Sequence, residues 1–289
     1  MTVPISFRFA KFSLFGWLLV CPAAGLTSAC SDDDDEGSRL LPSKRPEASE
    51  QDAGKDTFGF FLISYEAIKR YSGSADGFGG DLGGIEGADS LCQQTAEYST
   101  PSAKDKTWRA FLSTTKEDAI DRIGDGPWYD RVGRLVANNR DELLNDRPRN
   151  ADPEIIDDLP NEYGIPNQFP NSDTQAVDNH QTLTGSGSDG RLYEQASGGS
   201  GGGSPTQCPD GWTKEKATCW DWTSKEPEGC PRVGHSWPSN FSGRNWISVW
   251  NEGGCAPGTN LIQTGGLTGE ATVGSGGGYG GFYCFALAD

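Results

Sequence analysis

The sequence predicts an α+β fold that is held together by disulfide bonds. Apolar residues recur at helical spacing early in the chain, whereas short strand-like segments separated by turns dominate its later part. Helix and strand signals that are segregated in this way are typical of the α+β class. Two of the 8 cysteines lie before residue 31, and the other six are spread over both parts.

The expected elements follow in chain order. Residues 58–68, "FGFFLISYEAI", have the composition of a buried strand, and the turn-rich residues 77–84 lead into a helix marked by Ile85, Ala88, Leu91, Cys92 and Ala96. Residues 107–114 are expected to form a strand, 116–123 a short helix, 124–139 a turn with a hairpin, and 140–144 one helical turn. Short strands are expected in "CWDWTS", "GHSW", "RNWISVW" and "GGFYCFAL".

The glycine-rich stretch from Gly77 to Gln93 has the strand–turn–helix order of a phosphate-binding loop. However, Asp81, Glu86 and Asp89 crowd the start of the helix, where carboxylates take the place that an anion would occupy. The stretch also lacks the Lys-Ser/Thr of a P-loop and a strict G-x-G-x-x-G. We therefore exclude a nucleotide site here.

The first 30 residues are typical of an export signal. Basic residues precede the apolar run "FSLFGWLLV", which is too short for a comfortable membrane span, and "AAGLTSAC" then ends at Cys30. Small residues before a cysteine resemble the lipobox of bacterial lipoproteins, although Leu26 lies one position further from Cys30 than usual. Lipidation of Cys30 is the expectation, and cleavage after Ala29 with secretion is the alternative.

The rest of the chain divides into a tether and one domain. Residues 31–57 are charged and poor in large apolar side chains, which predicts a disordered spacer. Residues 58–289 are interpreted as one domain, and the Gly/Ser-rich segment 196–205 as a flexible loop within it.

The formal net charge of −17 argues against nucleic acid and heparin-like polyanions, because both require clustered Lys and Arg. It leaves neutral sugars, calcium and proteins open as partners. Six cysteines in an exported chain indicate disulfide bonds rather than metal thiolates, but their spacing alone does not choose among the pairings.

Several motifs together resemble one known family. "GGIEGADSLCQQTAE", "TWRAFLSTT", "GRLVANNRDELL", "GSDGR", "CWDWTS", "GHSW" and "YCFA" are similar to the endostatin-like branch of the C-type-lectin-like fold, as found in bacterial lipoproteins. The resemblance covers most of 58–289, apart from the Gly/Ser loop and residues 146–174. It implies a C-type-lectin-like domain with a long irregular loop region. It also implies the bridges Cys92–Cys284 and Cys219–Cys255, which leaves Cys208 and Cys230 to pair outside the family pattern.

Calcium is the cofactor that the wider fold suggests. Calcium-dependent lectins hold the metal with a Glu-Pro-Asn loop and a Trp-Asn-Asp strand, and here Glu226 and Glu228 flank a proline while Asn251 and Glu252 follow Trp250. Both motifs depart from the lectin pattern, and a charged turn with a strand end explains the same letters. A second set of candidate oxygen ligands is Asp178, Asn179 and Asp189, for which capped turns are the alternative.

No zinc centre is expected, because His180 and His235 are the only histidines and lie outside the domain start used by animal endostatins. The sequence shows no G-x-S-x-G or H-E-x-x-H motif, so an enzyme is not expected. The expected function is a lipid-anchored binding module of the bacterial cell envelope with a carbohydrate or protein ligand. The alternatives are a structural envelope protein and a carboxylate-based hydrolase.

Overall fold

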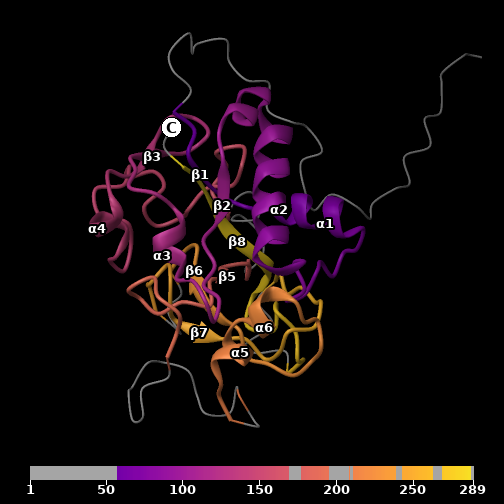
Figure 1. Cartoon of the computed structure of the whole chain (residues 1–289). Helices are drawn as coiled ribbons and strands as arrows, with labels where there is room; N and C mark the ends of the chain where they lie inside the picture. Colours follow the sequence, from indigo (N-terminus) through magenta and orange to yellow (C-terminus); the bar gives the residue numbers. More distant parts are fainter. Residues whose placement is uncertain are drawn as a thin grey trace, which may run out of the picture. The chain divides into compact units, whose positions relative to one another are not determined.

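The computed structural model describes residues 57–168, 177–194, 208, 211–238, 243–262 and 269–287, all within one compact unit, Leu41–Asp289. The expected signal segment with Cys30, the expected tether apart from Thr57, and the expected Gly/Ser loop 196–205 lie outside these residues. The described part is a mixed α+β structure with three disulfide bonds (Figure 1). None of its helices is both long and apolar enough to cross a membrane.

The last strand, β8 (Gly278–Ala286), organises the main sheet. All nine of its residues are buried, as expected for a strand covered on both faces. Its second half pairs antiparallel with β1 (Phe60–Leu62) on one side and β2 (Trp108–Ala110) on the other. Its first half pairs parallel with β5 (Gln181–Leu183), and the sheet continues through β6 (Arg232–His235) to β7 (Trp250–Asn251).

Alternate residues of these strands point into two separate cores, because successive side chains of a strand face opposite sides of its sheet. One core is covered by α1 (Tyr65–Ser72) and α2 (Gly84–Ser99), and α2 lies beside β2 in Figure 1. The other contains Trp246, the aromatic strand residues Phe60, Tyr283 and Phe285, and Phe111, which directly follows β2. This second core packs near α3 (Ala119–Arg122), α4 (Arg140–Leu143) and the hairpin of β3 (Trp128–Tyr129) and β4 (Leu135–Ala137).

The glycines before α2 serve a tight turn. Gly83 and Gly84 have φ of 78° and 75°, in the left-handed region that glycine enters without steric cost. Asp89 was expected among the acidic residues at the start of the helix, but it lies inside α2. Its carboxylate accepts hydrogen bonds from Ala110 N at 2.8 Å and Arg122 Nη2 at 2.7 Å, and so joins α2 to β2 and α3.

The three disulfide pairs are the two that the family resemblance implied and the third, Cys208–Cys230, that it left over. Cys92 of α2 is bonded to Cys284 of β8, so the helix is tied to the central strand. Cys219–Cys255 and Cys208–Cys230 connect segments of the loop-rich part that follows β5. The α+β class and the disulfide framework are therefore confirmed.

Three expected strands differ from the structure. The segment from Tyr65 forms α1 instead of extending β1, because Ser64 Oγ caps the helix by accepting from Ala67 N at 3.1 Å. "CWDWTS" forms the single turn α6 (Cys219–Trp222). Only the last residue of "RNWISVW", Trp250, belongs to a strand.

Candidate ligand-binding cleft

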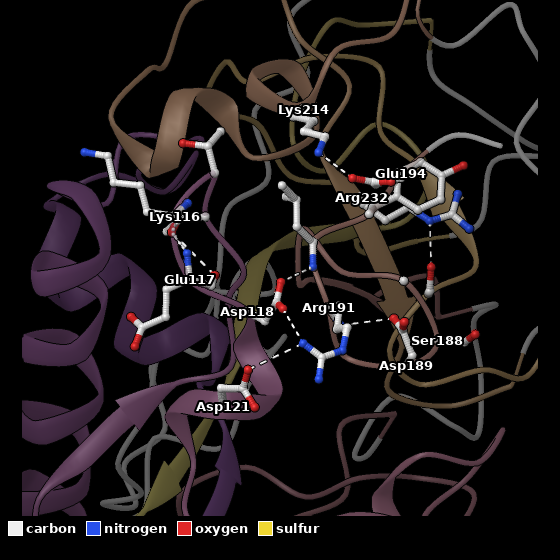
Figure 2. Close-up of a pocket in the computed structure, with 16 residues that line it drawn as sticks. Lys116, Glu117, Asp118, Asp121, Ser188, Asp189, Arg191, Glu194, Lys214 and Arg232 are labelled. Carbon is white, nitrogen blue, oxygen red and sulfur yellow. Dashed lines mark hydrogen bonds and ion pairs between the residues drawn. The ribbon is translucent and has the colours of Figure 1, made fainter. Parts of the chain in front are cut away.

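A cleft of about 990 Å³ opens beside β6 (Figure 2). One wall is the loop from Thr114 to Asp118 with Asp121 of α3, and the other is the turn and loop 187–194. Lys214 of α5 (Lys214–Ala217), together with Arg232 and Ser248, completes the lining. Most of these side chains are charged or carry hydroxyl groups, so the cleft offers many hydrogen-bonding groups to a ligand.

Asp118 fixes the two walls to each other. Its Oδ1 accepts from the backbone N–H of Leu192 at 2.8 Å, and its Oδ2 accepts from Arg191 Nη1 at 2.7 Å. The backbone adds a third link, in which Ile120 N donates to Gly190 O at 3.0 Å. Only glycine fits at position 190, because a Cβ there would lie 2.8 Å from Ile120 Cβ. The width of the cleft is thus set by several bonds rather than one.

The loop at 114–117 is held from behind by α6. The Asp221 carboxylate accepts from Thr115 N and from Thr115 Oγ1, both at 2.7 Å. Buried Trp222 donates from Nε1 to Ser113 O at 2.8 Å. These two contacts position the cleft wall from a segment more than 100 residues away in the chain.

The backbone of α6 is strained. All four residues from Cys219 to Trp222 have φ between 46° and 64°, a left-handed turn that costs roughly 1–2 kcal/mol per residue. The Cys219–Cys255 bridge and the burial of Trp222 keep this conformation in place. Strain that the surrounding structure maintains is found at binding and catalytic sites. The strained turn α6 lies directly behind the cleft wall, and this supports the cleft as the functional site.

Most charges of the cleft are paired. Arg191 contacts Asp118, and Lys214 contacts Glu194 (Figure 2). Glu117 pairs with Arg122. The paired carboxylates keep lone pairs that can accept from the hydroxyl groups of a ligand.

One of the seven predicted calcium or ligand residues lines this cleft. Asp189 forms part of the 187–191 turn, where its Oδ1 accepts from Arg191 N at 3.1 Å. Glu226 and Glu228 are exposed on the loop before Cys230. Asn251 instead accepts from Arg232 Nη1 at 3.1 Å. The Glu-Pro-Glu loop and the Trp-Asn-Glu strand therefore do not point their side chains at a common centre.

The structure does bring Asp178 and Glu252 near each other. Glu252 is fully buried, and its Oε2 accepts from Ser275 Oγ at 2.8 Å and Gly276 N at 2.7 Å. Asp178 lies against the neighbouring Gly277, where a Cβ would meet its carboxylate. Burial, with a smaller contribution from the charge of Asp178, raises the pKa of Glu252 to about 8.

Two oxygens at this place have no hydrogen-bond partner, namely Glu252 Oε1 and Gln181 Oε1. Gln181 also touches Gly276, to whose carbonyl its Nε2 donates at 2.7 Å. Carboxylate and amide oxygens are the ligand type that calcium prefers. The donor chemistry therefore fits a calcium ion, although within the described residues no group of three or more His, Cys, Asp and Glu side chains is arranged to hold a metal.

The remaining predicted polar residues are part of the scaffold. Asn179 accepts from Trp237 Nε1 at 2.9 Å and donates to Asn167 O at 2.7 Å. His180 and His235 are buried, with ring centroids 4.3 Å apart. Burial and the neighbouring His180 hold the pKa of His235 well below its usual value.

Sequence reasoning missed Asp118, Arg191 and Arg232 as cleft residues. Asp118 and Arg191 are 73 positions apart, and no local pattern predicts their contact. A weak signal was present for Arg232, a lone arginine within the otherwise uncharged segment 229–237. Comparison of the sequence with protein-family models and with curated proteins finds no match.

Proposed function

We propose that this chain is a lipid-anchored binding module of the bacterial cell envelope and that its cleft binds a carbohydrate. The proposed fold is the endostatin-like branch of the C-type-lectin-like fold. The α+β sheet, the bridge from the first long helix to the last strand, and the bridge within the loop-rich region support this fold assignment.

The observation that carries the proposal is the fixed, polar cleft. Sugars present many hydroxyl groups, each of which donates and accepts, so a site for them needs side chains of both kinds in fixed positions. The cleft supplies carboxylates and cations already held in pairs, together with the hydroxyls of Ser188 and Ser248. Since these side chains are ordered before the ligand arrives, less entropy is lost on binding. An apolar ligand would find chiefly Leu192 and the Tyr193 ring.

The test is a glycan-binding screen on the purified full chain, with the Asp118→Asn variant. Loss of the Asp118 charge loosens both walls, and we expect glycan affinity to fall at least roughly five-fold, as for about 1 kcal/mol of hydrogen bonding. Asp105→Asn is the matched control, because Asp105 is exposed outside the cleft and the change in net charge is the same. Binding of no glycan, with capture of an envelope protein that Asp118→Asn abolishes, would replace the carbohydrate with a protein ligand.

Anchoring at the membrane is tested separately. We expect labelled palmitate to be incorporated into the full chain and to be lost in Cys30→Ala, which should then leave the membrane fraction. Lipid anchoring needs more than one acyl chain to be stable, and bacterial lipoproteins carry several. A Cys30→Ala variant that still fractionates with membranes would contradict lipidation at Cys30.

Calcium is proposed as a cofactor that stabilises the domain at the start of β5 rather than one that bridges protein and sugar. The unpartnered oxygens of Glu252 and Gln181 support this second proposal. In this role Glu252, Asp178 and Gln181 would supply the side-chain ligands.

A further inference from the structure

Arg232 lies at the floor of the cleft and is almost fully buried, with 3% of its surface exposed. Its Nε donates to Ser248 Oγ at 2.8 Å and its Nη1 to Asn251 Oδ1 at 3.1 Å. The guanidinium lies over the ring of Tyr193, 4.2 Å from the ring centroid. These contacts fix the orientation of the group but leave its charge without a carboxylate in ion-pair range among the described residues.

The other two buried arginines of the described chain have a different environment. Arg122 forms an ion pair with Asp89 at 2.7 Å. Arg147 donates to the carbonyl oxygens of His235 and Ser236 at 2.6 and 2.7 Å, and Asp157 lies 3.9 Å away. A buried charge without an opposite charge is costly, and proteins normally compensate it. Arg232 is therefore the exception that calls for an explanation.

Two other cations of the cleft are already neutralised. Arg191 pairs with Asp118, and Lys214 pairs with Glu194. Residues 195–207, which follow Glu194 directly in the sequence, contain no Asp or Glu. Burial lowers the pKa of Arg232 to about 10, which leaves the guanidinium charged at neutral pH. No carboxylate of the described residues thus compensates the positive charge that Arg232 places at the floor of the cleft.

We propose that Arg232 binds the carboxylate of an acidic sugar residue, so that the cleft selects saccharides that contain a uronic acid. This inference rests on the carbohydrate-binding function proposed above and names its ligand class. A guanidinium pairs with a carboxylate through charge-assisted hydrogen bonds, which are about twice as strong as neutral ones. The hydroxyl groups of the same sugar would contact the paired carboxylates and the serine hydroxyls of the walls.

The overall charge limits the ligand to a sparsely charged saccharide. A net charge of −17 repels a dense polyanion such as heparin, whereas one carboxylate close to a buried arginine is attracted over a short distance. Salt screens the long-range repulsion more than the short buried contact. We therefore expect added salt to leave the affinity unchanged or to raise it, the opposite of polyanion binding.

The test compares three probes on the purified full chain by ligand-observed NMR titration: D-glucuronate, its neutral methyl ester and D-glucose. The ester has the shape of the acid without its charge, so the ratio of the two affinities reports the carboxylate contact. We expect glucuronate to bind roughly ten-fold or more tightly than the ester. In Arg232→Met this ratio should fall to about one, while the ester and glucose bind as before. Arg232→Lys, which keeps the charge, should retain part of the preference.

Lys225→Met is the matched control, because Lys225 is exposed outside the cleft and the substitution removes the same charge. We expect it to keep the preference for glucuronate. Equal binding of the acid and the ester by the wild-type protein would overturn the inference even if Arg232→Met failed to fold. Loss of the preference in both Arg232→Met and Lys225→Met would also overturn it, because general electrostatics would then explain the result. Absence of binding for all three probes and for every glycan of the screen would instead refute the carbohydrate-binding function itself.

Discussion

The Glu252→Gln substitution should change how the stability of this protein depends on pH. Glu252 is fully buried, and its pKa is raised from 4.5 in the unfolded chain to about 8 in the folded one. The folded state therefore holds a proton that the unfolded state releases between these two values. The stability that protonated Glu252 contributes is fully present below about pH 4.5 and is lost as the pH rises toward 8.

The size of the effect follows from the same two values. At about 1.4 kcal/mol per pH unit, the interval from 4.5 to about 8 corresponds to at most about 5 kcal/mol of unfolding free energy. Gln keeps an acceptor for Ser275 Oγ and Gly276 N but does not titrate. The free energy of unfolding of wild type should thus fall relative to Glu252→Gln as the pH is raised.

The assay is urea unfolding followed by tryptophan fluorescence, with disulfides intact and EDTA present, at a series of pH values between about 5 and 8. Asp158, whose pKa burial raises to about 6, contributes a slope of the same sign, but it is present in both proteins and cancels in the difference. Glu226→Gln is the control, because Glu226 is exposed on a loop and its substitution removes the same charge. Parallel pH profiles for wild type and Glu252→Gln would refute the reasoning.

Two further outcomes are expected. Calcium added at about pH 8 should raise the unfolding midpoint of wild type but not that of Glu252→Gln. A bound ion at 100 times its dissociation constant adds roughly 2.7 kcal/mol to the free energy of unfolding. Equal midpoints of the wild-type protein in calcium and in EDTA would remove calcium from the proposal. Replacing Cys92 and Cys284 with alanines removes a bridge across a sequence separation of 192 and should lower the free energy of unfolding by about 5 kcal/mol in the chain-entropy model. The same change at Cys208–Cys230, with a separation of 22, should lower it by about 3 kcal/mol. Urea unfolding of both double variants measures this difference, and a greater loss for the shorter loop would contradict the entropic explanation.

The elements that the sequence predicted well are those with a local signal. The helix from Gly84 to Ser99 has an apolar face of helical period, and β8 is a continuous run of glycine and aromatic residues that suits a strand buried on both faces. The short helices at 119–122 and 140–143 were also predicted. In each of these cases the local preference and the tertiary packing agree.

The turn at Cys219–Trp222 was predicted wrongly because local preference and tertiary structure disagree there. Alternating aromatic residues in "CWDWTS" indicate a strand, yet all four residues of the turn adopt left-handed φ values. The disulfide to Cys255 and the bond from Trp222 to Ser113 O favour the turn over the extended form. Such long-range contacts are not visible in a local pattern.

The same reason explains which carboxylates could be assigned a role from the sequence. The predicted ligand residues were chosen because Asp, Asn and Glu gather in turns, and turns account for Asp189, whose carboxylate accepts from Arg191 N. The residues that shape the cleft are instead recognised by their partners: Asp118 by its bonds to the opposite wall, and Arg232 by the absence of a carboxylate within ion-pair range among the described residues. In a chain with 41 acidic residues, the presence of an acid carries little information about function. A buried charge whose compensation is missing carries more, because folding alone gives no reason to retain it.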